Sequence, residues 1–295
     1  MSKKVAFIGL GVMGYPMAGH LSAQGHDVTV YNRTAAKAAK WVKRHGGRAA
    51  RTPKAAAEGA DLVFACVGND DDIRAVTLGP TGAFAGMTRG AVFVDHTTAS
   101  AGVARELAAA ARKQGLGFVD APVSGGQAGA ENGQLTIMCG GAKASFTKAR
   151  AAMAAYGKAV TLMGPAGSGQ LTKMVNQIAI AGLVQGLAEA LHFAQAAGLN
   201  AEQAVEVISK GAAQSWQMDN RALTMLADEF DFGFAVDWMK KDLGICLDEG
   251  RRQGASLPIT ALIDQFYGEI QRQGGGRWDT SSLIRRLRLL DGGAG

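Results

Sequence analysis

The chain has 295 residues, of which 47% are hydrophobic and 19% charged, a composition typical of a folded protein with a sizeable core and not of a disordered chain. Its formal net charge of +6 is modest. Basic residues crowd the segment from 33 to 54, but no aromatic-interleaved basic strand or nucleic-acid motif accompanies them, so we expect no nucleic-acid partner.

Cysteine and histidine spacing argues against structural metal or disulfides. The three cysteines lie far apart and form no C-x-x-C pair, and the five histidines form no ligand-like pair, so we expect no metal. The first residues lack the apolar stretch of a signal peptide, and the longest apolar stretch, 178–193, is interrupted by polar residues. We therefore expect a cytoplasmic protein that is not inserted in a membrane.

The first half of the chain alternates short apolar runs with helix-like stretches. Strand, helix, strand in repeated order predicts an α/β domain with a doubly wound parallel sheet of the Rossmann type over residues 1–164. The expected strands are 5–8, 27–31, 61–67, 91–97, 117–123, 134–141 and 159–164. The expected helices are 17–24, 35–45, 53–58, 70–76, 101–114 and 144–156.

The glycine-rich segment 164–169 marks a change in composition, after which strand patterns disappear. Residues 165–295 are predicted to form an all-helical substrate and dimerisation domain, opened by a long interdomain helix over 170–198. The other expected helices are 201–210, 219–229, 236–253 and 258–273. The long helix is apolar on most faces, which favours a homodimer or homotetramer.

A G-x-G-x-x-G motif directly follows the first predicted strand. Gly9 would allow a tight turn, Gly11 a close approach of a diphosphate to the backbone, and Gly14 close packing of the next helix. We expect this turn, including the intervening Leu10, Val12 and Met13, to bind a dinucleotide. The motif alone is weak, because such turns also occur without a ligand.

The end of the second predicted strand bears on the choice of dinucleotide. Asn32, Arg33 and Thr34 stand about twenty residues beyond the glycine turn, where an acidic residue would bind the ribose 2′-hydroxyl of NAD. A guanidinium without a carboxylate favours a 2′-phosphate, so NADP(H) is preferred over NAD(H). The alternative is that Asn32 only caps the following helix and Arg33 is merely exposed.

Two polar groups stand out in apolar surroundings. On the predicted long helix Lys173, Asn176 and Gln177 share one face, and a lysine there is costly unless it is used or paired. The segment Ser124-Gly125-Gly126 follows a strand and can present a hydroxyl and backbone N–H groups to a carboxylate. The alternatives are a lysine whose stem alone is buried and an ordinary turn.

Taken together, these residues resemble the β-hydroxyacid dehydrogenases, the 3-hydroxyisobutyrate dehydrogenase-like family that includes glyoxylate/succinic semialdehyde and tartronate semialdehyde reductases. The matching segments are FIGLGVMGYPMAGHL (7–21), VDHTTAS (94–100), DAPVSGG (120–126), GSGQLTKMVNQ (167–177) and KKDLG (240–244). They occur in the family's order over nearly the whole chain. Two positions depart from the pattern: His20 stands where the family commonly has Asn, and His96 precedes two threonines in place of the usual serine-threonine pair.

The resemblance implies the role of each site residue. Lys173 would be the general acid/base, and Asn176, with Gln177 beside it, would orient the lysine and the substrate. The three residues of the Ser124 turn would hold the substrate carboxylate. Val67 and Thr98 would border the cofactor, and Lys241 would close over it.

The expected function is therefore an NADP(H)-dependent oxidoreductase that transfers hydride between the nicotinamide and a short β-hydroxyacid or the corresponding semialdehyde or keto acid. A glyoxylate/succinic semialdehyde reductase is the close alternative. An imine reductase or a non-catalytic dinucleotide-binding scaffold is less favoured, because such proteins usually lack the lysine that stands here at 173.

Overall fold

A computed structural model describes residues 2–290 of the chain. The chain divides into two compact units, the first ending at Lys173 and the second beginning at Met174. The predicted domain limits of 1–164 and 165–295 stay a prediction. The first unit is built on a sheet and the second is helical throughout its described residues, so the expected fold class is confirmed.

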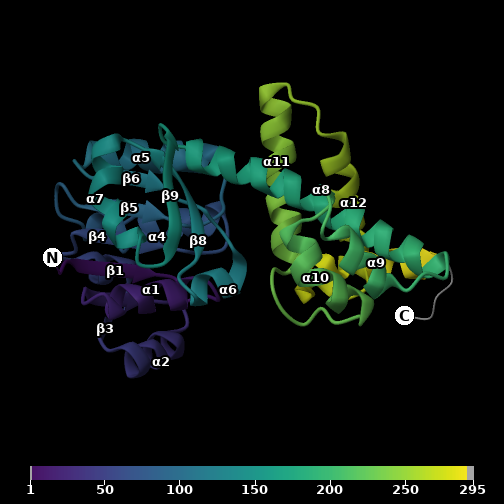
Figure 1. Cartoon of the computed structure of the whole chain (residues 1–295). Helices are drawn as coiled ribbons and strands as arrows, with labels where there is room; N and C mark the ends of the chain where they lie inside the picture. Colours follow the sequence, from purple (N-terminus) through teal and green to yellow (C-terminus); the bar gives the residue numbers. More distant parts are fainter. Residues whose placement is uncertain (1, 291–295) are drawn as a thin grey trace. The chain divides into compact units, whose positions relative to one another are not determined.

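The sheet of the first unit has nine strands in the order β3-β2-β1-β4-β5-β6-β8-β7, with β9 paired to β8. The order can be followed in Figure 1 from β3 through β1, β4 and β5 to β6. Neighbouring strands from β3 to β6 are parallel. The strands are β1 (Lys4–Ile8), β2 (Asp27–Tyr31), β3 (Arg48–Ala49), β4 (Leu62–Ala65), β5 (Val92–Asp95), β6 (Gly117–Asp120), β7 (Val123–Ser124), β8 (Leu135–Gly141) and β9 (Gly157–Gly164).

Helices cover both faces of this sheet, because the central strands are apolar on both sides. In β1, Val5 and Phe7 belong to one buried cluster and Ala6 and Ile8 to a second, as the alternation of side chains along a strand requires. The connecting helices are α1 (Gly14–Ala23), α2 (Ala35–His45), α3 (Pro53–Ala57), α4 (Asp70–Thr77), α5 (Ala101–Lys113), α6 (Gly126–Glu131) and α7 (Lys143–Met153).

The sheet departs from the predicted pattern after β6. The expected strand over 117–123 is two strands, β6 and β7, and both pair antiparallel with β8. Pro122 lies between them; it has no N–H to donate to a ladder, and its carbonyl instead accepts from the Met138 amide at 3.1 Å. The short elements β3 and α6 were not predicted, because two and six residues are too few to show a period.

The second unit consists of helices packed around one core. Its buried cluster draws residues from six helices, and the predicted helix over 236–253 agrees with the structure at both ends. The helices are α8 (Ser168–Ala196), α9 (Ala201–Ile208), α10 (Trp216–Leu226), α11 (Val236–Gln253), α12 (Pro258–Arg272) and α13 (Leu283–Leu290). The last of these was not predicted.

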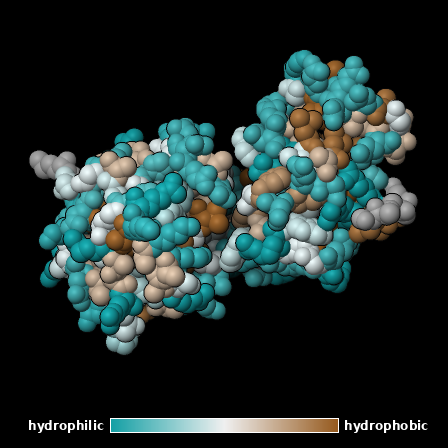
Figure 2. Space-filling model, turned by 90° about the horizontal axis from the view of Figure 1, so that it is seen from below, coloured by the Kyte–Doolittle hydropathy of each residue, from teal (hydrophilic) through white to brown (hydrophobic). Residues whose placement is uncertain are grey.

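Helix α8 belongs to the core of this unit for most of its length. It is the one helix of residues 2–290 that is long and apolar enough to span a membrane by length and composition. However, Ala181, Val184, Ala188 and Leu191 recur at helical spacing and are buried in the core cluster. Leu183 and Phe193 on the same helix are exposed, and Figure 2 shows hydrophobic residues at the surface among mainly hydrophilic ones.

Candidate active site

The glycine turn lies at the centre of the sheet, where the strand order reverses. The chain passes from β1 to β2 on one side, while β4 lies on the other side of β1. In open α/β sheets, ligands bind beyond the carboxyl ends of the strands at this point. The predicted dinucleotide turn, Gly9 to Gly14, follows the carboxyl end of β1 and leads into α1.

The three glycines of the turn serve different purposes. Gly9 has φ +94°, and a Cβ there would lie 2.2 Å from the Cys66 carbonyl oxygen. A Cβ on Gly14 would lie 1.9 Å from the Gly9 carbonyl oxygen, so both glycines are needed for the fold itself. Gly11 has no protein atom within 4 Å of its would-be Cβ and no positive φ. The fold does not require glycine at position 11, whereas a diphosphate against the backbone would; the turn therefore fits a dinucleotide.

Asn32 ties the end of β2 to this turn. Its Oδ1 accepts from the Leu10 amide at 2.9 Å, and its Nδ2 donates to the Thr34 carbonyl at 3.1 Å. The alternative in which Asn32 caps the following helix is wrong, since Thr34 is the N-cap residue of α2 and makes no side-chain cap bond. The Asn32 side chain thus shapes the wall of the turn.

Arg33 extends into solvent beside the same turn. Its side chain is 88% exposed, and its Nη1 lies 3.5 Å from the Asp72 carboxylate at the start of α4. An ion pair this exposed contributes little to stability and is easily exchanged for another anion. Arg33 is therefore accessible to a ligand anion at the end of β2.

Val67 and Thr98 come from the two neighbouring strand ends. The Val67 amide donates to Thr97 Oγ1 at 3.1 Å, which joins the loop after β4 to the loop after β5. The Thr97 amide in turn donates to Asp95 Oδ1 at 2.9 Å. Both predicted cofactor-bordering residues thus lie at the carboxyl edge of the sheet, on loops bonded to one another.

The Ser124 turn has the backbone that its sequence predicts. Ser124 ends β7, and Gly125 and Gly126 have φ values of +129° and +61°, which favour glycine. Both glycines are exposed, and Ser124 is half-buried. An exposed hydroxyl-bearing turn of this kind can receive a polar ligand without a change of backbone.

Lys173 lies in the first two turns of α8 and is 7% exposed. The N-terminus of α8 is held by Asp120 at the end of β6, whose Oδ1 accepts from the Gly167 amide at 2.8 Å and whose Oδ2 accepts from the Gln170 amide at 3.0 Å. Burial raises the pKa of Asp120 to about 6, although these backbone hydrogen bonds oppose the shift.

In the second unit, Gln177 and Lys241 converge on one buried carboxylate. Gln177 Nε2 donates to Asp242 Oδ2 at 2.7 Å, and Lys241 Nζ lies 3.1 Å from Asp242 Oδ1. The Asn176 amide donates to Gln177 Oε1 at 2.7 Å. Three of the predicted residues, Asn176, Gln177 and Lys241, therefore belong to one polar network, which is centred on Asp242.

The two unusual histidines have structural contacts. His96 is 1% exposed, with Nδ1 2.6 Å from the Ala121 carbonyl and Nε2 2.8 Å from the Tyr156 hydroxyl. Burial lowers the pKa of His96 to about 4, so the ring is neutral, and it lies in the core. His20 Nε2 lies 3.0 Å from the carbonyl oxygens of both Ala130 and Glu131, at the end of α6.

Several large side chains near the start of α10 and α11 differ in their exposure. Met218 is buried in the core, whereas Trp216 and Trp238 are at least 40% exposed. The Arg221 guanidinium carbon lies 5.0 Å from the Trp216 ring centroid and 4.8 Å from that of Phe232. These rings mainly pack against cationic side chains.

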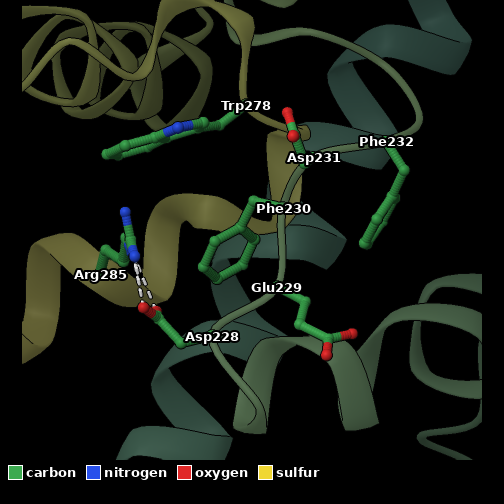
Figure 3. A pocket seen from close by; sticks show the side chains of 7 residues that line it. All are labelled: Asp228, Glu229, Phe230, Asp231, Phe232, Trp278 and Arg285. Carbon is green, nitrogen blue, oxygen red and sulfur yellow. Dashed lines mark hydrogen bonds and ion pairs between the residues drawn. The ribbon is translucent and has the colours of Figure 1, made fainter.

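A hollow of about 380 Å³ lies in the second unit but contains none of the predicted site residues. Figure 3 shows the Trp278 ring above the Arg285 guanidinium, which is bonded to Asp228. The Arg285 carbon lies 4.4 Å from the Trp278 centroid, and the Asp228 pKa is held low by the hydrogen bonds from Arg285. Asp228 and Arg285 are already paired with one another, and we assign the hollow no ligand. Its other lining residues are Glu229, Phe230, Asp231 and Phe232.

Sequence reasoning missed Asp120, Gln170 and Asp242 as members of the site. Each stands inside a segment that was singled out: Asp120 opens DAPVSGG, Gln170 follows the glycines of GSGQ, and Asp242 follows Lys241. An acidic or amide side chain in an apolar segment was the available signal. Within residues 2–290, no group of three or more His, Cys, Asp or Glu side chains is arranged to hold a metal ion.

Comparison with known proteins identifies the family of this chain. Residues 4–164 match the family described as the NAD binding domain of 6-phosphogluconate dehydrogenase, and residues 167–287 match that described as NAD-binding of NADP-dependent 3-hydroxyisobutyrate dehydrogenase. An uncharacterized oxidoreductase of Shewanella frigidimarina is 65% identical over 96% of this chain and 98% of its own length. The 2-hydroxy-3-oxopropionate reductase of Escherichia coli is 32% identical over 97% of this chain and 98% of its own.

A solved structure extends the likeness to three dimensions. The 3-hydroxyisobutyrate dehydrogenase of Mycobacterium tuberculosis, determined with L-serine, has a TM-score of 0.88 and 30% identity, covering 98% of this chain and all of its own. Sequence families, relatives and structure agree over nearly the whole length. The chain therefore belongs to the β-hydroxyacid dehydrogenase family, whose members are NAD(P)-dependent oxidoreductases acting on CH–OH groups.

Proposed function

We propose that this protein is an NADP(H)-dependent dehydrogenase or reductase that interconverts a short β-hydroxyacid and the corresponding semialdehyde or keto acid, with Lys173 as general acid/base. The observation that carries the proposal is the burial of Lys173, 7% exposed as a residue, near the start of α8. A lysine with so little access to water is retained at a cost, which use in catalysis explains.

Lys173 has a defined task in each direction. During reduction of a carbonyl, negative charge builds on the oxygen; the ammonium group stabilises that charge and gives its proton to the oxygen, becoming a neutral amine. During oxidation, the neutral amine takes the hydroxyl proton back. The bound nicotinamide supplies or accepts the hydride at the carbon.

The residues of the glycine turn would hold the cofactor. Gly11 leaves the space above the turn open for the diphosphate, and Arg33 at the end of β2 would bind the 2′-phosphate. Val67 and Thr98 would border the nicotinamide end. Lys241, 3.1 Å from Asp242, would approach the cofactor as a second cation.

The substrate would be held by its carboxylate. Ser124 with Gly125 and Gly126 would bind it through the hydroxyl and backbone N–H groups, and Asn176 and Gln177 would orient the reacting end. Two relatives are named 2-hydroxy-3-oxopropionate reductase and 3-hydroxyisobutyrate dehydrogenase, and the compounds in both names carry the reacting oxygen on the third carbon. This spacing favours a β-hydroxyacid over glyoxylate, which is one carbon shorter, and over succinic semialdehyde, which is one longer.

The test is a substrate panel with both cofactors. Loss of reduced-nicotinamide absorbance would be followed with 2-hydroxy-3-oxopropionate, glyoxylate and succinic semialdehyde, and its gain with 3-hydroxyisobutyrate. We expect turnover with the three-carbon semialdehyde class and NADPH, and a Lys173→Met variant slowed by about 10²–10⁴-fold in kcat. Lys210→Met, at an exposed lysine paired with Glu206, is the matched control. A Lys173→Met enzyme within threefold of wild type would refute the assignment.

Two further properties belong to the proposal. We expect a homodimer or homotetramer, because the exposed Leu183 and Phe193 of α8 leave apolar surface on the helical unit. We also expect the protein to act in the cytoplasm. Sedimentation velocity would measure the number of subunits, and a monomer at micromolar concentration would contradict the first expectation.

A further inference from the structure

We propose that Asp120 and Gln170 are positioning residues that hold the first turn of α8, and with it Lys173, at a set distance from the loop carrying Thr98. The inference rests on the proposed function, since it assigns how the general acid/base is placed. All of these residues belong to the first unit, which ends at Lys173.

Asp120 fastens the start of α8 to the sheet. Its two carboxylate oxygens accept from two different backbone amides of the turn that opens the helix, Gly167 at 2.8 Å and Gln170 at 3.0 Å. Hydrogen bonds from N–H groups to a carboxylate are stronger and shorter than neutral ones, and the helix N-terminus favours negative charge. The first turn is thereby bound to the end of β6 at two points.

The surroundings of Asp120 leave the helix no room to shift toward the sheet. A Cβ on Gly169 would lie 2.4 Å from the Met138 carbonyl oxygen and 2.8 Å from Asp120 Oδ2. On the other side, a Cβ on Gly140 would lie 2.6 Å from Asp120 Oδ1. The carboxylate is enclosed between two glycine backbones, one from β8 and one from α8.

Gln170 fixes the helix to the cofactor loop. Its Nε2 donates to the Thr97 carbonyl at 2.7 Å, and its Oε1 accepts from the Ala99 amide at 3.1 Å, so one side chain spans the residue between them, Thr98. Gln170 is fully buried. Its two hydrogen bonds cannot be replaced by water without opening this region.

Lys173 follows Gln170 by three residues on the same helix. Side chains at this spacing share one face, and a helical side chain leans back over the turn that precedes it. The lysine therefore extends over the turn that Asp120 and Gln170 hold. A shift of that turn would move the ammonium group of Lys173 relative to the loop of Thr98. The chemical nature of Lys173 and Thr98 would not change.

The test uses two variants in the full-length protein. Gln170→Leu keeps the bulk but cannot bridge Thr97 and Ala99, and Asp120→Asn removes one acceptor and the charge. We expect kcat to fall by about 10²-fold, the loss typical of a displacement of the order of 1 Å, with the substrate KM and the NADPH dissociation constant within about threefold of wild type. The deuterium isotope effect on transfer from the cofactor should rise, because chemistry becomes slower than product release. The pH profile of kcat should also move, which a change in the amount of folded enzyme would not produce.

A second readout needs no cofactor. Amide hydrogen exchange at Gly167 and Gln170 should accelerate by at least tenfold in Asp120→Asn, since their acceptor is weakened, while amides in the middle of α8 keep their protection. If Asp120→Asn does not fold, Gln170→Leu carries the test, because it leaves both bonds to Asp120 in place. The matched control is Gln185→Leu, a change of the same type at a buried glutamine later in α8 that donates to Glu189 at 2.7 Å.

The outcomes separate this inference from the proposed function. A folded Gln170→Leu enzyme with wild-type kcat, isotope effect and pH profile would overturn the positioning role while Lys173→Met remains inactive. If NADPH affinity in Gln170→Leu fell by the same factor as kcat, the positioning role would also be overturned. Gln170 would then act only by shaping the loop that binds the cofactor. An active Lys173→Met enzyme would refute the proposed function, whatever the behaviour of Gln170→Leu.

Discussion

Replacing Asp95 by asparagine should change how the stability of this protein depends on pH. Asp95 ends β5, directly beside Asp120 in the parallel register, and is fully buried. Its Oδ1 accepts from the Thr97 amide, while its Oδ2 is buried without a hydrogen-bond partner. Burial raises its pKa from 3.8 to about 7; the hydrogen bonds from Thr97 oppose the shift, and the charges of Asp120 and Asp70 add to it.

The sign follows from proton binding. Between pH 3.8 and about 7 the unfolded chain has lost the Asp95 proton while the folded chain keeps it, so the free energy of unfolding falls as the pH rises through this window. A shift of roughly three pKa units corresponds to about 4 kcal/mol, of which about 2 to 3 kcal/mol accrues between pH 5 and 8. Above pH 7 both the folded and the unfolded chain have lost the Asp95 proton, so the contribution of Asp95 to the free energy of unfolding no longer changes with pH. Asparagine keeps an acceptor for Thr97 but has no proton to lose.

The assay compares Tm of wild type and Asp95→Asn by circular dichroism from pH 5 to 8. The buried amide of asparagine carries its own cost, but that cost does not change with pH. The difference in Tm, variant minus wild type, should therefore increase by about 4–12 °C over this range. Asp71→Asn, whose carboxylate is 94% exposed, serves as control and should give a flat difference. Parallel curves for Asp95→Asn and wild type would refute the reasoning.

Three further predictions follow from contacts in the first unit. Tyr156→Phe leaves His96 Nε2 buried without its partner at 2.8 Å and should lower the free energy of unfolding by about 1–3 kcal/mol, measured by urea denaturation; an unchanged midpoint would contradict the contact. Gly169→Ala places a Cβ 2.4 Å from a carbonyl oxygen, so we expect a larger loss of stability than in Gly186→Ala on the same helix, where the space is open. Asp72→Asn frees Arg33 from its ion pair and should tighten NADPH binding several-fold while leaving NADH binding unchanged, measured by fluorescence titration; equal effects on both cofactors would argue against a 2′-phosphate at Arg33.

Much of the fold could be predicted because the patterns that specify it are local. The apolar strands and the glycine turn that follows β1 are contiguous, and helices such as α2 and α11 agree with the predicted ranges at both ends. Short elements were missed for the same reason: β3 and α6 have too few residues to show a period. Whether such short segments form a strand or a helix depends on contacts with residues far away in the sequence.

The candidate site was predicted unevenly. Gly9, Gly14 and Gly125 could be recognised because their conformations or close contacts belong to the turn itself. The contacts of His96 could not be predicted, since only the folded chain shows that its ring bonds to Ala121 and Tyr156. Nothing in the local sequence distinguishes a histidine beside a ligand from one buried between two strand ends.

The sequence by itself determined that the chain begins with an α/β domain and ends with helices. It also determined the dinucleotide turn and the presence of a lysine in an apolar helix. Each of these features depends on residues that are close to one another in the sequence. Only the tertiary structure decided which buried groups meet. Asp120 reaches Gly167 across 47 positions of chain, and Gln170 reaches Thr97 across 73. Such pairs are decided by the order of strands in the sheet, which brings distant strand ends to one edge, and no local pattern of side chains contains that order.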